Sequence, residues 1–170
     1  RMRIDSFADL YVSLSSNPGS FGFNFFNYFF EKYAVNAQYK PLKLDIKYND
    51  YEHFFGVVSN LRKVGIKGIS VSMPFKKLAY LYGNSNNGGV PNSNTISFNN
   101  DKVNNFNTDI FGFEKCLFQI LDDGCVNFLV YGDGAASKSI CSILDKYAFL
   151  YSVYRREQER VFDDEHYHNF

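Results

Sequence analysis

The chain has 170 residues, of which 45% are hydrophobic and 21% charged, and its 18 basic and 18 acidic side chains give a formal net charge of zero. This composition is typical of a globular protein and argues against disorder of the whole chain. The lack of a basic field argues against non-specific binding to nucleic acid or to an anionic membrane. No apolar run is long enough to span a bilayer, and residues 1–10 do not resemble a signal peptide. We therefore expect a cytoplasmic protein, monomeric or homodimeric.

Cysteine and histidine positions do not indicate a metal site. Cys116, Cys125 and Cys141 form neither a C-x-x-C pair nor a zinc spacing, and the first and last of them fall in apolar helical stretches. We expect buried free thiols in a reducing compartment. His166 and His168 are expected to be solvated.

The first part of the chain alternates strand and helix patterns. Strands are predicted over residues 8–14, 39–46 and 68–73, and helices over 21–35 and 51–64. The dense apolar residues of 21–35 favour a helix that is buried on most of its surface. Asn49 or Asp50 is a good N-cap for the next helix. This order implies a parallel-rich sheet covered by helices, which is an α/β fold.

A loop rich in Asn, Ser and Gly follows over residues 82–94. Residues 95–98 and 102–106 read as a β-hairpin, and Asp109 opens a helix that runs to about Leu121. A strand, a helix and a strand are then predicted over 126–131, 136–146 and 149–154. We expect two domains, 1–108 and 109–170, with the boundary close to this helix.

The turn between the strand predicted over 126–131 and the helix predicted over 136–146 carries a nucleotide-binding pattern, G-x-G-x-x-small. Gly132 and Gly134 permit a tight turn and a close approach of backbone to a pyrophosphate, and Ala135 and Ala136 open a helix whose N–H groups face it. A strand-to-helix turn that merely needs glycine is the alternative. Asp133 would repel a pyrophosphate if it pointed toward it.

A basic segment follows the second strand of this unit. Where an NAD enzyme usually has an acid for the ribose, this chain has Arg155 and Arg156, with Arg160 beyond them. Guanidinium groups suit a 2′-phosphate, so this segment favours NADP over NAD. A solvated charge run that includes Glu157 and Glu159 is the alternative.

A lysine follows the strand that Pro74 ends, in the stretch S-V-S-M-P-F-K over residues 70–76. Fixed at a strand end, Lys76 could hold a proton for a carbonyl oxygen. The alternative is a solvated lysine.

This stretch resembles the N-V-T-x-P-(F/H)-K motif of the shikimate dehydrogenase family, and most of all its variant branch with V-S-M-P-F-K. Further blocks occur in the family's order. Residues 13–22 resemble S-L-S-G-x-P-x-x-F-G, residues 93–95 resemble the end of A-V-N-T, residues 107–109 match N-T-D, and residues 131–137 resemble the G-A-G-G-A-(A/S) loop.

The resemblance implies a substrate-binding domain over 1–108 and the first half of a Rossmann-type NADP-binding domain over 109–170. It implies reversible, NADPH-dependent reduction of 3-dehydroshikimate to shikimate. Lys76 would hydrogen-bond the reacting oxygen and relay its proton, and Asp109 would orient the lysine and contact a substrate hydroxyl. Ser20, Ser72 and Asn94 would bind the substrate. The alternative to a functional role is that Asp109 is only a helix N-cap and that Asn94 is only a turn residue.

Three departures from the family pattern bear on these expectations. Gly22 and Phe23 follow Ser20-Phe21, so one hydroxyl of the family's Ser-x-Ser carboxylate clamp is missing. The link between Lys76 and Asn94 is short and poor in helix formers. The chain ends after one mononucleotide half, as a fragment, as a sequence with missing residues or as a decayed relative. A non-catalytic ligand-binding or interaction module is therefore the rival hypothesis, and quinate is a rival substrate.

Overall fold

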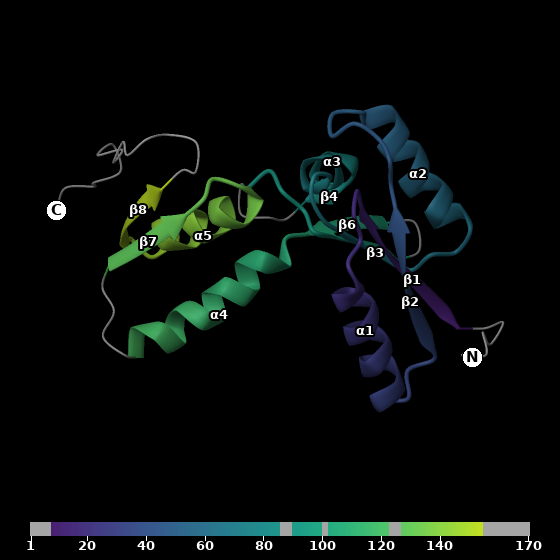
Figure 1. The fold of residues 1–170 in the computed structure, drawn as a ribbon, viewed down its shortest axis with the longest axis horizontal. Helices are drawn as coiled ribbons and strands as arrows, with labels where there is room; N and C mark the ends of the chain where they lie inside the picture. Colours follow the sequence, from purple (N-terminus) through teal and green to yellow (C-terminus); the bar gives the residue numbers. More distant parts are fainter. Residues whose placement is uncertain (1–7, 86–89, 100–101, 123–126, 155–170) are drawn as a thin grey trace. The chain divides into compact units, whose positions relative to one another are not determined.

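The structure is a computed structural model that describes residues 8–85, 90–99, 102–122 and 127–154. The chain divides into two compact units (Figure 1). Unit 1 comprises Arg1–Asn86 and Pro91–Phe106, and unit 2 comprises Asn87–Val90 and Asn107–Phe170. None of the described helices is long and apolar enough to cross a membrane.

Unit 1 is built on a six-stranded sheet of order β2-β1-β3-β5-β6-β4. Its elements are β1 (Asp9–Ser15), α1 (Ser20–Lys32), β2 (Ala37–Lys43), α2 (Tyr51–Lys63), β3 (Gly68–Val71), α3 (Lys76–Tyr82), β4 (Asn84–Ser85), β5 (Thr95–Asn99) and β6 (Lys102–Phe106). Strand β1 runs parallel to both β2 and β3, whereas β5 runs antiparallel to β3 and β6. The predicted parallel-rich α/β sheet is confirmed.

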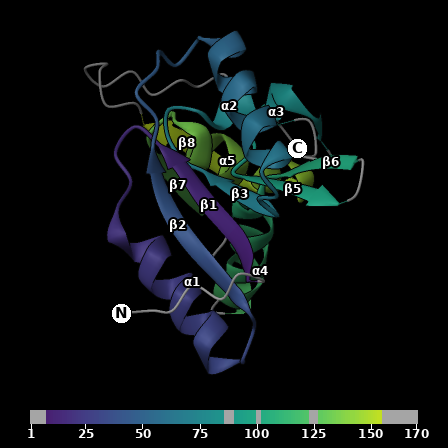
Figure 2. The ribbon, with the colours of Figure 1, turned by 90° about the vertical axis from the view of Figure 1, so that its right-hand side faces the viewer.

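Alternate residues of β1 face opposite sides of this sheet, as the pleat requires. Val12 and Leu14 belong to the main core, which α2 and α3 cover. Tyr11 points the other way and its ring lies 5.7 Å from that of Phe30 in α1. Figure 2 shows α1 beside β2 and α2 on the other side of the strands. Helices thus cover both faces of the parallel part of the sheet.

Helix α2 follows the predicted start signal. The Asp50 carboxylate accepts a hydrogen bond from the backbone N–H of His53 at 3.1 Å, which is the usual N-cap geometry. The main core gathers the fully or nearly fully buried apolar side chains of α2, α3, the central strands and the adjoining loops: Val12, Leu14, Leu44, Phe54, Val58, Ile66, Ile69, Val71, Phe75, Leu78, Ala79 and Ile96.

The prediction that the helix after β1 is buried on most of its surface is wrong. No residue of α1 is buried, and Phe21 is 81% exposed. The helix contacts the sheet through one stripe, in which the rings of Phe26 and Tyr39 stack at 4.7 Å. Asn27 adds two hydrogen bonds to the backbone of Tyr39. Apolar residues of α1 lie on all sides of the helix, so their periodicity could not identify the stripe that contacts the sheet.

Unit 2 contains α4 (Thr108–Asp122), β7 (Asn127–Tyr131), α5 (Ala135–Lys146) and β8 (Leu150–Tyr154). Strands β7 and β8 pair in parallel, with α5 as their connection. The core of the unit is formed by Leu117, Val130, Ile143 and Leu144. The predicted strand-helix-strand unit is therefore present.

The expectation of buried thiols is wrong for Cys116, which is exposed, and Cys141 is only half-buried. Cys116 lies on α4 one position before the fully buried Leu117, on a different face of the helix. Burial raises the pKa of the Cys141 thiol. Cys125 lies outside the described residues.

Exchange of Phe54 for alanine tests the main core. The ring of Phe54 is fully buried, so Phe54→Ala should lower the free energy of unfolding by about 3–5 kcal/mol, measured by urea denaturation. Phe21→Ala is the matched control, because it removes the same ring from a site that is 81% exposed and should cost less than about 0.5 kcal/mol. Equal losses in the two variants would contradict this core.

Candidate functional site

The carboxyl ends of β1 and β3 bring the two N-terminal sequence blocks together. These strands are parallel neighbours, so the segments that follow them leave from the same edge of the sheet. The backbone N–H of Ser72 donates to the carbonyl of Leu14 at 3.0 Å. The Ser15 hydroxyl makes a long hydrogen bond of 3.5 Å to the carbonyl of Met73. The loop before α1 and the S-M-P-F-K segment are thus adjacent.

The block at residues 93–95 joins the same edge. The backbone N–H of Val71 donates to the carbonyl of Asn94 at 2.8 Å, and that of Ser93 donates to the carbonyl of Lys76 at 2.9 Å. The side-chain oxygen of Asn94 accepts from the Thr95 hydroxyl at 3.1 Å. Backbone hydrogen bonds therefore place Asn94 beside the start of α3. The short segment between Lys76 and Asn94, which departs from the family pattern, does not prevent this.

Lys76 is the first residue of α3 and its side chain is half-buried. The residue before it, Phe75, is fully buried and its ring lies 5.9 Å from that of Phe54. The Met73–Pro74 peptide bond is cis. Phe75 therefore anchors the motif in the core, while Ser72 on the preceding turn is exposed.

Sequence reasoning missed the residue that holds the other end of α3. Asn105, buried in β6, donates from its amide nitrogen to the carbonyls of Ala79 and Tyr80. Gly83 ends this helix, where an added Cβ would lie 3.0 Å from side-chain atoms of both Asn105 and Val103, so a larger residue would have to displace them. No pattern in the sequence marks Asn105, because the carbonyls that it binds are more than 20 residues away.

In unit 2, α4 begins at Thr108 and not at Asp109. The side-chain oxygen of Asn107 accepts from the backbone N–H of Asp109 at 3.2 Å, and its amide nitrogen donates to the Ser139 hydroxyl at 2.8 Å. Asn107 therefore satisfies the helix terminus, and the alternative in which Asp109 serves as N-cap is wrong. Asn107 and Ser139 are both buried, and sequence reasoning gave neither a role of this kind.

The glycine turn of unit 2 has the geometry that its pattern predicts. Gly132 has φ +105°, in the region that favours glycine, and its N–H donates to the carbonyl of Tyr154 at 2.7 Å. Gly134 is the N-cap of α5, and no atom lies within 4 Å of an added Cβ at either glycine. Ala135 and Ala136 form the first turn of α5, whose N–H groups lack intrahelical partners. A phosphate-bearing ligand fits this open turn.

Asp133 and the two arginines after β8 are the remaining residues that bear on the predicted cofactor site. Asp133 is exposed within the glycine turn. Arg155 and Arg156 lie outside the described residues. In the described part of the chain, no three His, Cys, Asp or Glu side chains are grouped as a metal site would need.

No protein-family model matches the chain. A shikimate dehydrogenase-like protein of Haemophilus influenzae is 28% identical over 149 residues, which are 86% of this chain and 52% of that protein. The NADP⁺ shikimate dehydrogenase of Bacillus subtilis is 34% identical over 117 residues, 62% of this chain and 41% of that protein. The crystal structure of Aquifex aeolicus shikimate dehydrogenase matches with a TM-score of 0.75 and 25% identity, over 92% of this chain and 59% of that one.

The strand-helix-strand unit with its glycine turn is the arrangement of one mononucleotide-binding half of a Rossmann-type fold. Over the residues that these comparisons match, the chain is similar to members of the shikimate dehydrogenase family. It spans about half the length of the curated relatives that it matches.

Removal of the Asn105 side chain tests how α3 is held. Asn105→Ala leaves the carbonyls of Ala79 and Tyr80 without this donor and should lower the free energy of unfolding by about 1–3 kcal/mol. Amide hydrogen exchange in α3 should accelerate more than exchange in α2. Asn60→Ala, on the exposed side of α2, is the control. Unchanged exchange in α3 would show that other contacts hold the helix.

Proposed function

We propose that this chain supplies the substrate site and the first half of the cofactor site of an NADP-dependent shikimate dehydrogenase. The proposed reaction is the reversible reduction of 3-dehydroshikimate to shikimate. Residues 1–108 would bind the substrate and residues 109–170 the cofactor, in a cytoplasmic monomer or homodimer. The observation that carries the proposal is that Ser72 and Lys76, from one sequence block, and Asn94, from another, lie at one edge of one sheet.

Lys76 is proposed to act on the reacting oxygen. When the ketone is reduced, its oxygen gains a proton, and an ammonium group within hydrogen-bond reach can donate it and take it back in the reverse reaction. The buried Phe75 supports this role, because it fixes the backbone of the lysine while the side chain remains half accessible.

Asp109 is proposed to orient the lysine and to accept a hydrogen bond from a substrate hydroxyl. A carboxylate beside an ammonium favours the charged form of both groups.

Ser20, Ser72 and Asn94 are proposed to bind the substrate. Ser20 is exposed at the N-terminus of α1, where the free N–H groups and the helix dipole favour the substrate carboxylate. The hydroxyl of Ser72 and the amide of Asn94 suit ring hydroxyls. Phe23, where the variant branch has threonine, removes one hydroxyl from the carboxylate site, so affinity for shikimate should be lower than a complete clamp would give.

The cofactor site is proposed to use the glycine turn and the basic segment after β8. Gly132, Gly134, Ala135 and Ala136 would hold the pyrophosphate, and Arg155 and Arg156 would pair with the 2′-phosphate. When bound, NADPH supplies the hydride. The names of the relatives, which are NADP⁺ dehydrogenases, favour this enzyme over the non-catalytic module.

The assigned role of Lys76 is tested by comparing adjacent lysines. Lys76→Ala should lower kcat for NADPH formation from shikimate by roughly 10²–10⁴-fold, while shikimate binding measured by calorimetry largely persists. Lys77→Ala is the matched control, since Lys77 is the exposed neighbour in α3 and should leave kcat unchanged. A Lys76→Ala variant with normal turnover would refute the role.

The same assay decides between substrates and between the two hypotheses. The turnover assay is run on the full-length protein, with shikimate and quinate as substrates in parallel reactions. A folded protein that turns over neither compound would contradict the dehydrogenase proposal. Binding of shikimate without binding of NADP⁺ would favour the module.

The cofactor turn is tested by a pair of glycine substitutions. Gly134→Ala adds a methyl group in open space at φ −73°, so stability should be unchanged while NADP⁺ affinity falls by about tenfold, because the methyl blocks close approach to the pyrophosphate. Gly132→Ala places alanine at φ +105° and should cost about 1–3 kcal/mol in urea denaturation. Wild-type NADP⁺ affinity in Gly134→Ala would remove the turn from the site.

A further inference from the structure

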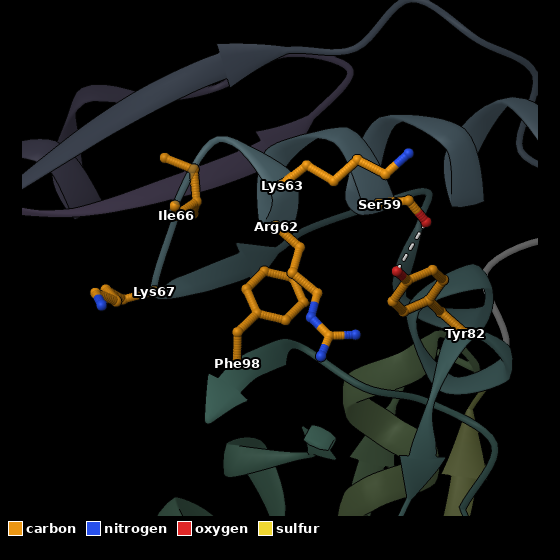
Figure 3. Close-up of a pocket in the computed structure, with 8 residues that line it drawn as sticks. Ser59, Arg62, Lys63, Ile66, Lys67, Tyr82 and Phe98 are labelled. Atoms are coloured by element: carbon orange, nitrogen blue, oxygen red, sulfur yellow. Dashed lines mark hydrogen bonds between the residues drawn. The ribbon is translucent and has the colours of Figure 1, made fainter. Parts of the chain in front are cut away.

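Unit 1 contains a pocket of about 550 Å³ that the proposed dehydrogenase function does not use (Figure 3). It lies where α2 ends and β3 begins, and the ends of α3 and β5 complete its wall through Tyr82 and Phe98. The candidate active site is at the carboxyl end of β3, whereas this pocket is at its amino end. A ligand here is therefore separate from the substrate of the dehydrogenase reaction.

The polar lining of this pocket is basic. Arg62, Lys63 and Lys67 contribute three positive charges, and none of the described residues that line the pocket is an Asp or a Glu. Figure 3 shows the guanidinium of Arg62 reaching into the middle of the lining, with Lys67 toward one edge and Lys63 directed along α2. The Asp9 carboxylate lies 3.8 Å from the Lys67 ammonium and offsets part of the charge of that lysine.

The remaining wall combines a hydroxyl pair with an aromatic ring. The Ser59 and Tyr82 hydroxyls lie 3.0 Å apart, so one of the two hydrogen atoms is left over for a ligand. Phe98 presents an apolar surface on the same pocket, which suits the flat body of an organic molecule. The volume is within the usual range of small-molecule sites.

Helix electrostatics explain only part of this arrangement. Arg62 and Lys63 occupy the last turn of α2, where cations offset the negative end of the helix dipole. Lys67 is outside the helix, and backbone hydrogen bonds to Leu10 and from Phe98 hold it between β1 and β5. The dipole accounts neither for this third cation nor for the hydroxyl pair.

We propose that this pocket binds a small organic anion, namely a phosphate or carboxylate group attached to a ring. The anionic group pairs with the planar fork of Arg62, because a guanidinium matches two oxygens of either anion. Lys63 and Lys67 raise the local positive potential. The leftover hydroxyl hydrogen of the Ser59–Tyr82 pair adds a neutral donor, and the ring packs on Phe98.

Phenyl phosphate, benzoate and the neutral benzyl alcohol test the proposal on the whole chain, by calorimetry and by ¹H–¹⁵N NMR. We expect one or both anions to bind, with shifts of the backbone amides of residues 59–67, and the alcohol not to bind. The preferred anion identifies the ligand as a phosphate or a carboxylate. Because the reporter residues differ, binding at the glycine turn of unit 2 is distinguished by shifts at residues 132–136.

Variants of the lining then assign the site. Arg62→Gln should weaken anion binding by roughly tenfold, and Arg62→Lys should recover part of the loss because it keeps the charge without the fork. Lys63→Gln should weaken it by about twofold. Lys32→Gln is the matched control, since Lys32 is also in the last turn of a helix but outside the pocket, and should have no effect.

Two results would overturn the proposal. The first is wild-type affinity in a folded Arg62→Gln variant, and the second is a set of anion-induced shifts confined to residues outside the pocket. Neither depends on dehydrogenase activity, because the probes do not react. A failed test of the dehydrogenase function would therefore not contradict the anion site, and a failed test of the anion site would not contradict the dehydrogenase function.

Discussion

The parallel backbone pairing of β1 with β3 determines where the candidate functional residues of unit 1 lie. The register sets Leu14 beside Val71, so that both side chains enter the core under α2 and α3. A slip of one residue would turn Val12 and Leu14 to the opposite face, away from Phe54. Burial of these side chains therefore fixes the register, and the register brings Ser15 and Ser72 to the same edge of the sheet.

From that edge, the position of Lys76 depends on contacts at both ends of a short helix. Phe75 is buried in the core just before the lysine, and Asn105 binds the carbonyls near the end of α3. Seven residues make fewer than two complete helical turns with internal hydrogen bonds, too few for an independently stable helix. The geometry of the candidate catalytic lysine is therefore a property of tertiary packing.

The same sheet presents different chemistry at its two ends. At the carboxyl ends of β1 and β3 stand hydroxyl and amide side chains with one lysine, a set suited to a hydroxylated ring and its carbonyl. At the amino end of β3 stand Arg62 and Lys67 with an aromatic wall, a set suited to an anion on a flat body. Because β3 separates the two, a ligand at one end need not compete for space at the other.

Local patterns in the sequence were sufficient to predict the order of the main strands and helices, the Asp50 cap and the turn at Gly132, because each depends on residues close together in the chain. They were also sufficient for the blocks that carry the family resemblance. Which stripe of α1 is buried, that the Asn107 amide binds the Ser139 hydroxyl, and that Asn105 holds α3 were decided only by the tertiary structure. Each of these depends on a partner far along the chain, such as Tyr39, Ser139 or Ala79, and no local spacing encodes such a contact.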